Sequence, residues 1–557
     1  MLLTPVNLFL QRQTTLKNTA KSANQTSVTA PMPYDSVSFG KKLSNEETTA
    51  IFNNYNPVVK DFDSYHVPVH NKDIARRLQK SYTEKSFHDL FKYVKKHGTF
   101  DINLDPETKF VQTSIIDKKE NPLMSKLVWV TDTSNFMPLL KDTNPDLCVP
   151  LMENISGYYA KQQSSFDKII NNPLLFELNH DWPNTAKNGV GHVFNPENKI
   201  THKWYPRTRL DSIGLYLGTM SDLIKDGLQG SKYGYKKAAD ISQNAIESIA
   251  NTTAYLNKIV YPYAKDTGPW EEKTFNSTAS SDVAIINDAF RKVIDLMYSP
   301  TKDKELLKVR TRLLNAKNGS IFKDEQGLRN MLKIGEHRIK TNSAWEFPTQ
   351  RKRDGAMSFI FKTEKLDEDV INNAIKVFAR LKKFEKPTPK NKELVRDNGI
   401  LRYTGDNYLY INADLDFEKN VYIPNRKFPD RTEAQWFMVS DMSKAYGMIA
   451  KSLMDYIAKG GKSNAAKNLL QYAMQKETEY KNRSYARITG KNSYKANAKP
   501  CPAFKVPEAY QAVTDAKGKI KFVPGTHTPL TWAQASLYDA SKLFEQNLKR
   551  YPEIIKS

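Results

Sequence analysis

Residues 211–224 read DSIGLYLGTMSDLI, and this stretch decides the predicted fold. A helix drawn through it is apolar in nearly every direction, with Ile213, Leu215, Tyr216, Leu217, Met220 and Leu223. Residues 432–449, TEAQWFMVSDMSKAYGMI, show the same pattern. A helix that is apolar most of the way round is enclosed by other parts of the protein. Helices enclosed by helices favour two concentric layers, as in an α/α toroid, although a large irregular bundle would give the same pattern.

The rest of the chain after about residue 126 is repetitively helical. Apolar residues recur at the three-and-four spacing of one helix face within 236–260, 286–297, 371–381, 469–474 and 532–544. Polar loops punctuated by Pro and Gly separate these segments, without alternating strands. The sequence therefore predicts an all-α domain rather than a parallel α/β fold.

The first part of the chain reads differently. Residues 1–45 are rich in Ser, Thr, Asn, Gln and Lys without periodicity, which predicts a flexible leader. Residues 46–125 predict a small mixed region that packs on the toroid, with a helix in SFHDLFKYVKKHG ending at Gly98 and a strand in FVQTSIID. We expect the toroid itself over 126–557.

Composition limits the function classes. The chain has 557 residues, of which 39% are hydrophobic and 11% aromatic, so it can bury a large core. It has no apolar run of membrane-spanning length, and MLLTPVNLFLQRQ lacks the basic lead of a signal peptide. Two cysteines suit a reducing cytoplasm, and no metal or organic cofactor is suggested.

The formal net charge of +23 permits nucleic-acid binding. The basic residues are, however, spread among 61 acids, and the densest run, QRKRDG at 350–355, is short. A solvated basic surface is the favoured interpretation, with nucleic-acid binding as the minor alternative.

Several loops combine aromatic, acidic and small polar residues just before an enclosed helix. They supply the candidate substrate-binding residues Trp129, Asp132, Trp204, Arg207, Arg209, Asp211, Trp270, Glu272, Glu433, Trp436 and Trp532, with Glu508 between Pro507 and Tyr510. Aromatic rings offer a platform for a sugar ring, and carboxylates and arginines bind its hydroxyls. The alternative is that each acid caps a helix and each tryptophan fills core.

The stretch GPWEEKTFNSTASSDVAI, residues 268–285, poses the same choice. Glu271 and Glu272 follow Trp270 directly, and an aromatic wall raises the pKa of a nearby carboxyl, as a general acid requires. Capping of the following helix is expected from Thr278, Ser280, Ser281 and Asp282 instead. The two glutamates lie too far upstream to serve as caps.

The ordered motifs KLVWVTDTSNFMPLL, RLDSIGLYLGTM, GPWEE, GILRYTGDNY, TEAQWFMVSDM, VPEAY and PLTWAQASLYDASKLF resemble the glycoside hydrolase family 15 superfamily. This superfamily joins glucoamylases with the regulatory α and β subunits of phosphorylase kinase. The resemblance covers roughly 125 to 550. It implies an (α/α)6 toroid of the six-hairpin glycosidase type, and inverting hydrolysis of α-glucosidic bonds in glucans or maltooligosaccharides.

Site roles follow from the resemblance alone. It implies that Glu271 is the general acid and Glu508 the general base, with Glu272 and Asp132 contacting substrate. Two positions depart from the glucoamylase pattern: Thr131 replaces an arginine in the first loop, and Gly268 replaces an aspartate before Trp270. A lost arginine removes charge-assisted bonds of about 1.5 to 3 kcal/mol each, which Arg207 or Arg209 could supply. A non-catalytic, glucan-binding regulatory protein is therefore the alternative function.

Overall fold

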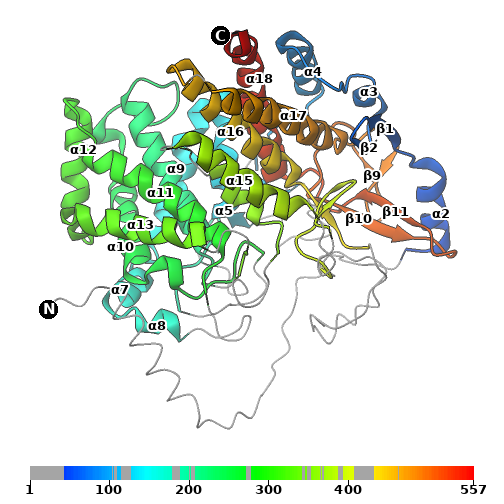
Figure 1. Ribbon diagram of the computed structural model, residues 1–557. Helices are drawn as coiled ribbons and strands as arrows, with labels where there is room; N and C mark the ends of the chain where they lie inside the picture. Colours follow the sequence, from blue (N-terminus) through cyan, green and yellow to red (C-terminus); the bar gives the residue numbers. More distant parts are fainter. Residues whose placement is uncertain are drawn as a thin grey trace, which may run out of the picture.

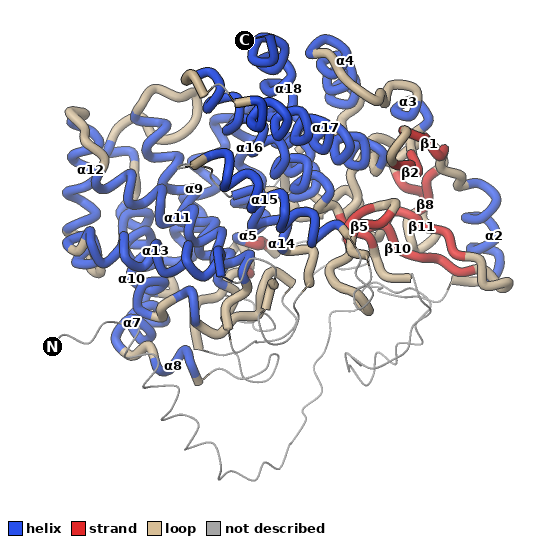
Figure 2. The backbone as a smooth tube through the Cα atoms, in the orientation of Figure 1, coloured by secondary structure: helices blue, strands red, loops and turns tan. Residues whose placement is uncertain are grey.

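The computed structural model describes residues 43–102, 104–105, 110–114, 127–178, 188–199, 201, 207–270, 277–341, 345–347, 353–363, 366, 369–386, 393–406, 432–461 and 463–556. Residues 1–42 of the predicted leader lie outside the described residues. Long helices make up most of the molecule, and the strands gather at one side of them (Figures 1 and 2).

Six helices form an inner layer in which each packs on the next, and the last packs back on the first. In chain order they are α5 (Val130–Thr143), α9 (Leu210–Leu228), α11 (Ser280–Tyr298), α14 (Met357–Thr363), α16 (Val439–Ala458) and α18 (Thr531–Lys556). This complete cycle of contacts is what the inner layer of an (α/α)6 toroid requires. The predicted all-α fold is confirmed, and the contacts between the inner helices agree with the expected toroid.

A second set of helices covers the inner layer. It comprises α4 (Glu84–Lys96), α6 (Cys148–Ala160), α10 (Gln243–Lys258), α12 (Lys304–Leu314), α13 (Glu325–Thr341), α15 (Val370–Glu385) and α17 (Asn464–Ala486). Each contacts one or two inner helices, and α4 from the N-terminal region packs on α18. Helix α4 begins at a Thr83 capping box and ends before Gly98, as predicted. The N-terminal region therefore contributes a helix to the outer layer.

The two helices whose sequences decided the fold are enclosed as expected. Tyr216 and Leu217 of α9 are fully buried on neighbouring faces, and so are Ala445 and Tyr446 of α16. Gly214 permits close packing of α9 on α11, because a Cβ atom at that position would lie 2.8 Å from the Ile286 side chain.

Short elements connect or flank these layers. The helical ones are α2 (Asn45–Asn54), α3 (Lys72–Ala75), α7 (Gln163–Asn171), α8 (Leu174–Glu177) and the 3-10 turns η2 (Pro145–Leu147), η3 (Ala238–Asp240), η4 (Tyr261–Tyr263) and η5 (Gly319–Lys323). The helix expected within 236–260 begins only at Gln243, because Ser242 caps it by accepting a hydrogen bond from the Ala245 amide.

The structure contains short β-strands that the sequence analysis did not predict, and most of them lie after residue 126. The strands are β1 (Val58–Phe62), β2 (Tyr65–Val69), β3 (Val128–Trp129), β4 (Val193–Phe194), β5 (Val395–Arg396), β6 (Gly399–Ile400), β7 (Gln435–Trp436), β8 (Ser493–Tyr494), β9 (Pro500–Cys501), β10 (Ala509–Thr514) and β11 (Ile520–Pro524). One antiparallel sheet has the order β11-β10-β7-β6-β5. Three of its strands have two residues, too few for alternation, and β10 is buried on both faces.

One further detail differs from expectation. Within the described part of FVQTSIID, Val111 and Ser114 make isolated bridges, to Leu104 and Leu530, instead of forming a strand. Among the described residues, no helix has the length and apolar character needed to cross a bilayer.

Candidate functional site at the mouth of the toroid

The starts of the inner helices lie at one end of the toroid, which we call the mouth together with the loops that precede them. Side chains and amides at neighbouring helix starts bond to each other. Thr131 Oγ1 of α5 lies 2.8 Å from Ser212 Oγ of α9, and the Asp211 amide donates to Asp282 Oδ2 of α11 at 3.2 Å. These bonds place the starts of α5, α9 and α11 side by side.

Four inner helices carry an aspartate in the first turn: Asp132, Asp211, Asp282 and Asp441. All are at most 8% exposed. The positive end of a helix dipole stabilises a carboxylate at this place, which offsets part of the cost of burial. Lys362 also pairs with Asp441 at 2.8 Å. Acids predicted from separate loops, Asp132 and Asp211, therefore belong to one set of carboxyls at the mouth.

The two arginines expected to replace the missing sugar-binding arginine differ in environment. Arg209 is 4% exposed and forms a two-point pair with Asp211, with Nε–Oδ1 at 2.9 Å and Nη2–Oδ2 at 3.1 Å. Arg207 is half-buried. The Arg209 guanidinium is thus engaged by Asp211. Arg207 is the more accessible of the two arginines. Thr131, at the departed position, is fully buried.

The loop before α11 brings Trp270 to the mouth. The Trp270 Nε1–H group donates to Asp354 Oδ1 at 2.7 Å, and the indole is half-buried. Glu271 and Glu272 lie outside the described residues, as does Trp204. Gly268 has φ of +66°, a conformation that favours glycine, and a Cβ atom there would lie 3.0 Å from Phe347 Cζ. The position that departs from the glucoamylase pattern is therefore built for glycine.

The start of α11 corrects the predicted capping group. The N-cap is Ala279, which has no capping side chain, and the helix begins at Ser280. The Ala279 amide donates to Asp266 Oδ2 at 3.2 Å, and the Ser281 amide donates to Glu346 Oε2 at 3.2 Å. Capping comes from acids distant in sequence, which a search for local cap signals cannot find.

Three of the carboxyls around this helix start are fully buried: Asp266, Asp282 and Glu346. Burial raises the pKa of Asp266 to about 6. Burial raises the pKa of Asp282 well above its usual range, and repulsion from Asp266 and Asp211 adds to this rise. Neighbouring carboxyls that are both buried retain a proton between them near neutral pH. The floor below the Trp270 loop therefore holds at least one protonated acid.

Aromatic side chains form the centre of the mouth. The Trp270 ring lies 5.7 Å from Trp436 and 6.2 Å from Phe359, and Phe359 stacks on Trp532 at 5.4 Å. The predicted Trp270, Trp436 and Trp532 thus meet, from the loop before α11, from β7 and from α18. Trp436 and Trp532 are only 4% and 8% exposed, so Trp270 is the more accessible of the three indoles.

A buried arginine lies against this aromatic cluster. The Arg402 guanidinium is 5.6 Å from the Trp270 ring and 5.1 Å from the Trp436 ring. It also forms a two-point pair with Asp406, with both bonds at 2.8 Å. Such stacked and paired geometry fixes the orientation of a guanidinium plane. The loop 399–406 therefore adds a charged group to the centre of the mouth.

Glu508 stands at the start of β10, beside the aromatic cluster. Its neighbour Ala509 pairs with Trp436 across β10 and β7, and its carbonyl accepts from the Phe437 amide at 3.1 Å. The carboxylate Oε2 lies 2.7 Å from His527 Nδ1. The sheet thus brings Glu508 next to the residues that contact Trp270.

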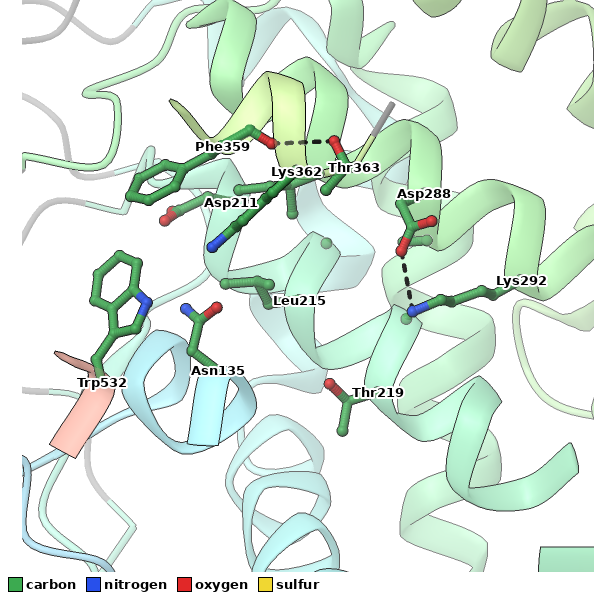
Figure 3. Close-up of a pocket in the computed structure, with 14 residues that line it drawn as sticks. Asn135, Asp211, Leu215, Thr219, Asp288, Lys292, Phe359, Lys362, Thr363 and Trp532 are labelled. Atoms are coloured by element: carbon green, nitrogen blue, oxygen red, sulfur yellow. Dashed lines mark hydrogen bonds and ion pairs between the residues drawn. The ribbon is translucent and has the colours of Figure 1, made fainter. Parts of the chain in front are cut away.

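A cavity lies between the inner helices α5, α9, α11, α14 and α18, and Figure 3 shows residues that line it. It holds about 480 Å³ of empty space, counting the part that is open to solvent. Trp532, Asn135, Lys362 and Asp211 line it, and the Trp532 indole and the Asn135 amide lie close together at its edge. Trp532 Nε1 is buried and makes no hydrogen bond with the described residues.

The remaining predicted residues lie at the edge of this arrangement. Trp129 pairs with Val193 through β3 and β4 and packs in a small apolar cluster with Leu127 and Val193, as a core residue would. Glu433 accepts a hydrogen bond from the Gly405 amide at 3.2 Å.

Sequence reasoning missed Arg402, Asp354, Phe359 and His527. Asp354 sits in the QRKRDG run that was interpreted as solvated surface, yet it is fully buried under Trp270. Arg402 lies inside the quoted GILRYTGDNY motif and was not singled out. Its spacing of four from Asp406 was a signal for an ion pair, whereas nothing local marks Phe359 or His527.

The sequence matches no protein-family model and no curated protein. The solved structures that are similar to the chain include a glucoamylase and a glycosidase variant. A glucoamylase from Saccharomycopsis fibuligera is 14% identical with a TM-score of 0.44, over 84% of this chain and 97% of that one. A glycosidase variant in complex with glucose is 11% identical with a TM-score of 0.42, over 85% and 98%. At these values the likeness concerns the fold and carries nothing about activity.

Proposed function

We propose that the chain is a glucoamylase-like inverting hydrolase of α-glucosidic bonds in glucans or maltooligosaccharides, acting in carbohydrate metabolism. One observation carries the proposal: Trp270, the residue before Glu271, contacts Trp436, whose strand pairs with the residue after Glu508. Trp270 and Ala509, the sequence neighbours of the two predicted catalytic glutamates, are thereby both linked to Trp436. A cytoplasmic location remains part of the proposal.

In the proposed reaction, Glu271 donates a proton to the glycosidic oxygen as the bond to the anomeric carbon breaks. Glu508 accepts a proton from a water molecule that attacks the opposite face of the sugar ring. Inversion requires room for that water, with the carboxyl groups about 6.5 to 9.5 Å apart. His527 Nδ1, at 2.7 Å from Glu508 Oε2, fixes the orientation of the base.

Substrate contacts are proposed for the exposed parts of the mouth. Trp270 offers the more accessible indole face, and Arg207 the more accessible guanidinium among the predicted residues. Asp132 and Glu272 are proposed to bind the hydroxyls of the terminal sugar. No step in this reaction requires a metal or an organic cofactor.

The experiment is incubation of the purified protein with maltooligosaccharides, followed by glucose measurement and NMR of the anomeric proton. Release of β-glucose that is lost in both Glu271→Gln and Glu508→Gln supports the hydrolase. Retained α-glucose as first product, or release that survives both substitutions, overturns it. Asp303→Asn, at the N-cap of the outer helix α12, is a control that leaves the mouth intact.

A second function is favoured by two observations at the departed positions: Thr131 is fully buried and bonded to Ser212, and Gly268 has a positive φ. Neither position can present the glucoamylase side chain. A non-catalytic glucan-binding protein, like the regulatory phosphorylase kinase subunits, would show saturable binding of maltooligosaccharides without glucose release.

A further inference from the structure

The backbone around Glu508 converges on a single buried side chain. Arg487, at the C-terminal end of α17, is 2% exposed. Its Nη1 donates to the carbonyls of Asn398 and Gln435, the latter at 3.0 Å. Its Nη2 donates to the carbonyls of Pro507 at 3.2 Å and Glu508 at 3.3 Å. One guanidinium therefore ties the β5–β6 turn, β7 and the start of β10 together.

Residues of the N-terminal region complete the surroundings of the Arg487 side chain. The Arg487 guanidinium lies 5.0 Å from the Tyr510 ring, on which His70 stacks at 4.0 Å. His70 Nε2 lies 2.8 Å from Asn398 Oδ1, and its Nδ1 bonds to the Tyr55 hydroxyl. Tyr510 in turn donates to the Arg487 carbonyl at 2.7 Å. Tyr55 and His70 thus lie directly behind the sheet that carries Glu508.

The charges in this cluster are simple. Burial lowers the pKa of His70 to about 3, so the imidazole is neutral. Burial also lowers the pKa of Arg487, but only to about 10, so the guanidinium keeps its charge. Across the described part of the chain, no carboxylate lies within ion-pair distance of Arg487. A buried charge without a counter-ion is costly, and here only carbonyl oxygens and an aromatic face offset that cost.

We propose that Arg487 is a positioning residue for the general base, and that Tyr55 and His70 hold it in place. The inference rests on the proposed role of Glu508. An arginine suits this task because its planar fork reaches several carbonyls at fixed angles, whereas a lysine presents one compact donor group. The N-terminal region is thereby part of the site rather than an appendage.

The test compares Arg487→Lys and Arg487→Met with Lys481→Met, which replaces a fully buried lysine of the same helix about two turns away. For Arg487→Lys we expect kcat on maltooligosaccharides to fall at least tenfold while KM changes less than twofold. Since a displaced base binds substrate normally, only the chemical step suffers. Lys481→Met should leave kcat of the folded protein unchanged.

A second readout does not depend on turnover. The nitrogen-15 and proton NMR signals of His527, assigned with His527→Gln, report its bond to Glu508. They should shift in the Arg487 variants and stay in place in Lys481→Met. If the wild-type protein releases no glucose, the proposed function fails, and these signals still decide whether Arg487 positions Glu508.

Unchanged kcat together with an unchanged His527 signal in Arg487→Lys would overturn the inference. If the Arg487 variants do not fold, His70→Phe replaces them, because it keeps the stack on Tyr510 and removes the bond to Asn398. It should shift the His527 signal in the same direction by a smaller amount. A folded His70→Phe protein with the wild-type signal and kcat would equally overturn the inference.

Discussion

The loop that carries Trp270 rests on buried carboxyls, whereas the strand that carries Glu508 rests on a buried guanidinium. Under the first, burial raises the pKa of Asp266 to about 6 and the pKa of Asp282 well above its usual range. Arg487, behind the second, keeps its positive charge. Hydrolysis with inversion needs one protonated and one ionised carboxyl, and sites achieve this by giving the two different surroundings. The two sides of this mouth differ in the charge of the groups buried beneath them.

The two sides are also fixed by different parts of the chain. The start of α11 is capped by Asp266 and Glu346, which belong to neighbouring loops of the toroid. The start of β10 is held through Arg487 by Asn398 and, behind it, His70 of the N-terminal region. Substitutions on one side should therefore leave the other intact, and this expectation orders the tests that follow.

The largest effect is expected for Glu508→Gln. Loss of a general base lowers kcat by roughly 10² to 10⁴-fold, and KM should change little because the ring contacts remain. Steady-state kinetics on maltooligosaccharides measure this. His527→Gln, which keeps a hydrogen-bond donor toward Glu508, is the milder matched variant and should lose less. A Glu508→Gln protein with a kcat within a few-fold of the wild type would remove Glu508 from the reaction.

Trp270→Phe tests the link between the acid side and the aromatic cluster. It keeps an aromatic ring beside Trp436 but removes the hydrogen bond to Asp354. Removing one partner of a buried charged group costs about 1 to 3 kcal/mol of the free energy of unfolding. Denaturant unfolding measures the loss, and Asp354→Asn in the Phe background should recover part of it. Additive losses in that pair would contradict the link.

Gly268→Asp restores the residue of the glucoamylase pattern and asks whether its absence limits turnover. The positive φ and the contact with Phe347 predict a loss of about 1 to 2 kcal/mol, since non-glycine residues rarely adopt this conformation. Thermal unfolding checks this, with Gly230→Asp, at an open position of similar φ, as control. A gain of activity without loss of stability would show that the loop has a conformation other than the one described.

The last test concerns the pH dependence of stability. The pKa of Asp282 is raised in the folded protein, so its contribution to stability is full below the unfolded value near 3.8 and is lost as pH rises through the raised value. Asp282→Asn cannot lose that proton. The stability of the variant relative to wild type should therefore improve from pH 4 to pH 9, by at most about 1.4 kcal/mol per pH unit. Unfolding temperatures of the variant and the wild type, measured from pH 4 to pH 9, test this expectation. If the variant's stability relative to the wild type stayed constant or fell with rising pH, a raised pKa of Asp282 would be contradicted.

Much of the fold was accessible from sequence because helix burial leaves a direct trace. The apolar circumference of 211–224 predicted an enclosed helix, and α9 is enclosed. The short strands beside Glu508 left no such trace. Two residues cannot show alternation, and β10 is buried on both faces, so its pattern resembles any apolar run.

The residues of the site were likewise predicted only in part from the sequence. Trp270, Trp436, Trp532 and Glu508 were predicted from loop composition and meet at the mouth. Asp354 was predicted to lie on a solvated surface because its neighbours in sequence are basic. In the structure it is fully buried and accepts a hydrogen bond from Trp270 Nε1. The cap of α11 likewise comes from Glu346, which lies 65 residues from Ser281 along the chain.

The sequence by itself determined which segments are enclosed helices and which loops carry the acids and aromatics, since both are local properties of composition and period. The tertiary structure alone decided which of those loops meet, and with what charge around them. Arg487 shows the reason. Its four carbonyl partners come from three separate segments, and each is a backbone atom that no residue type encodes.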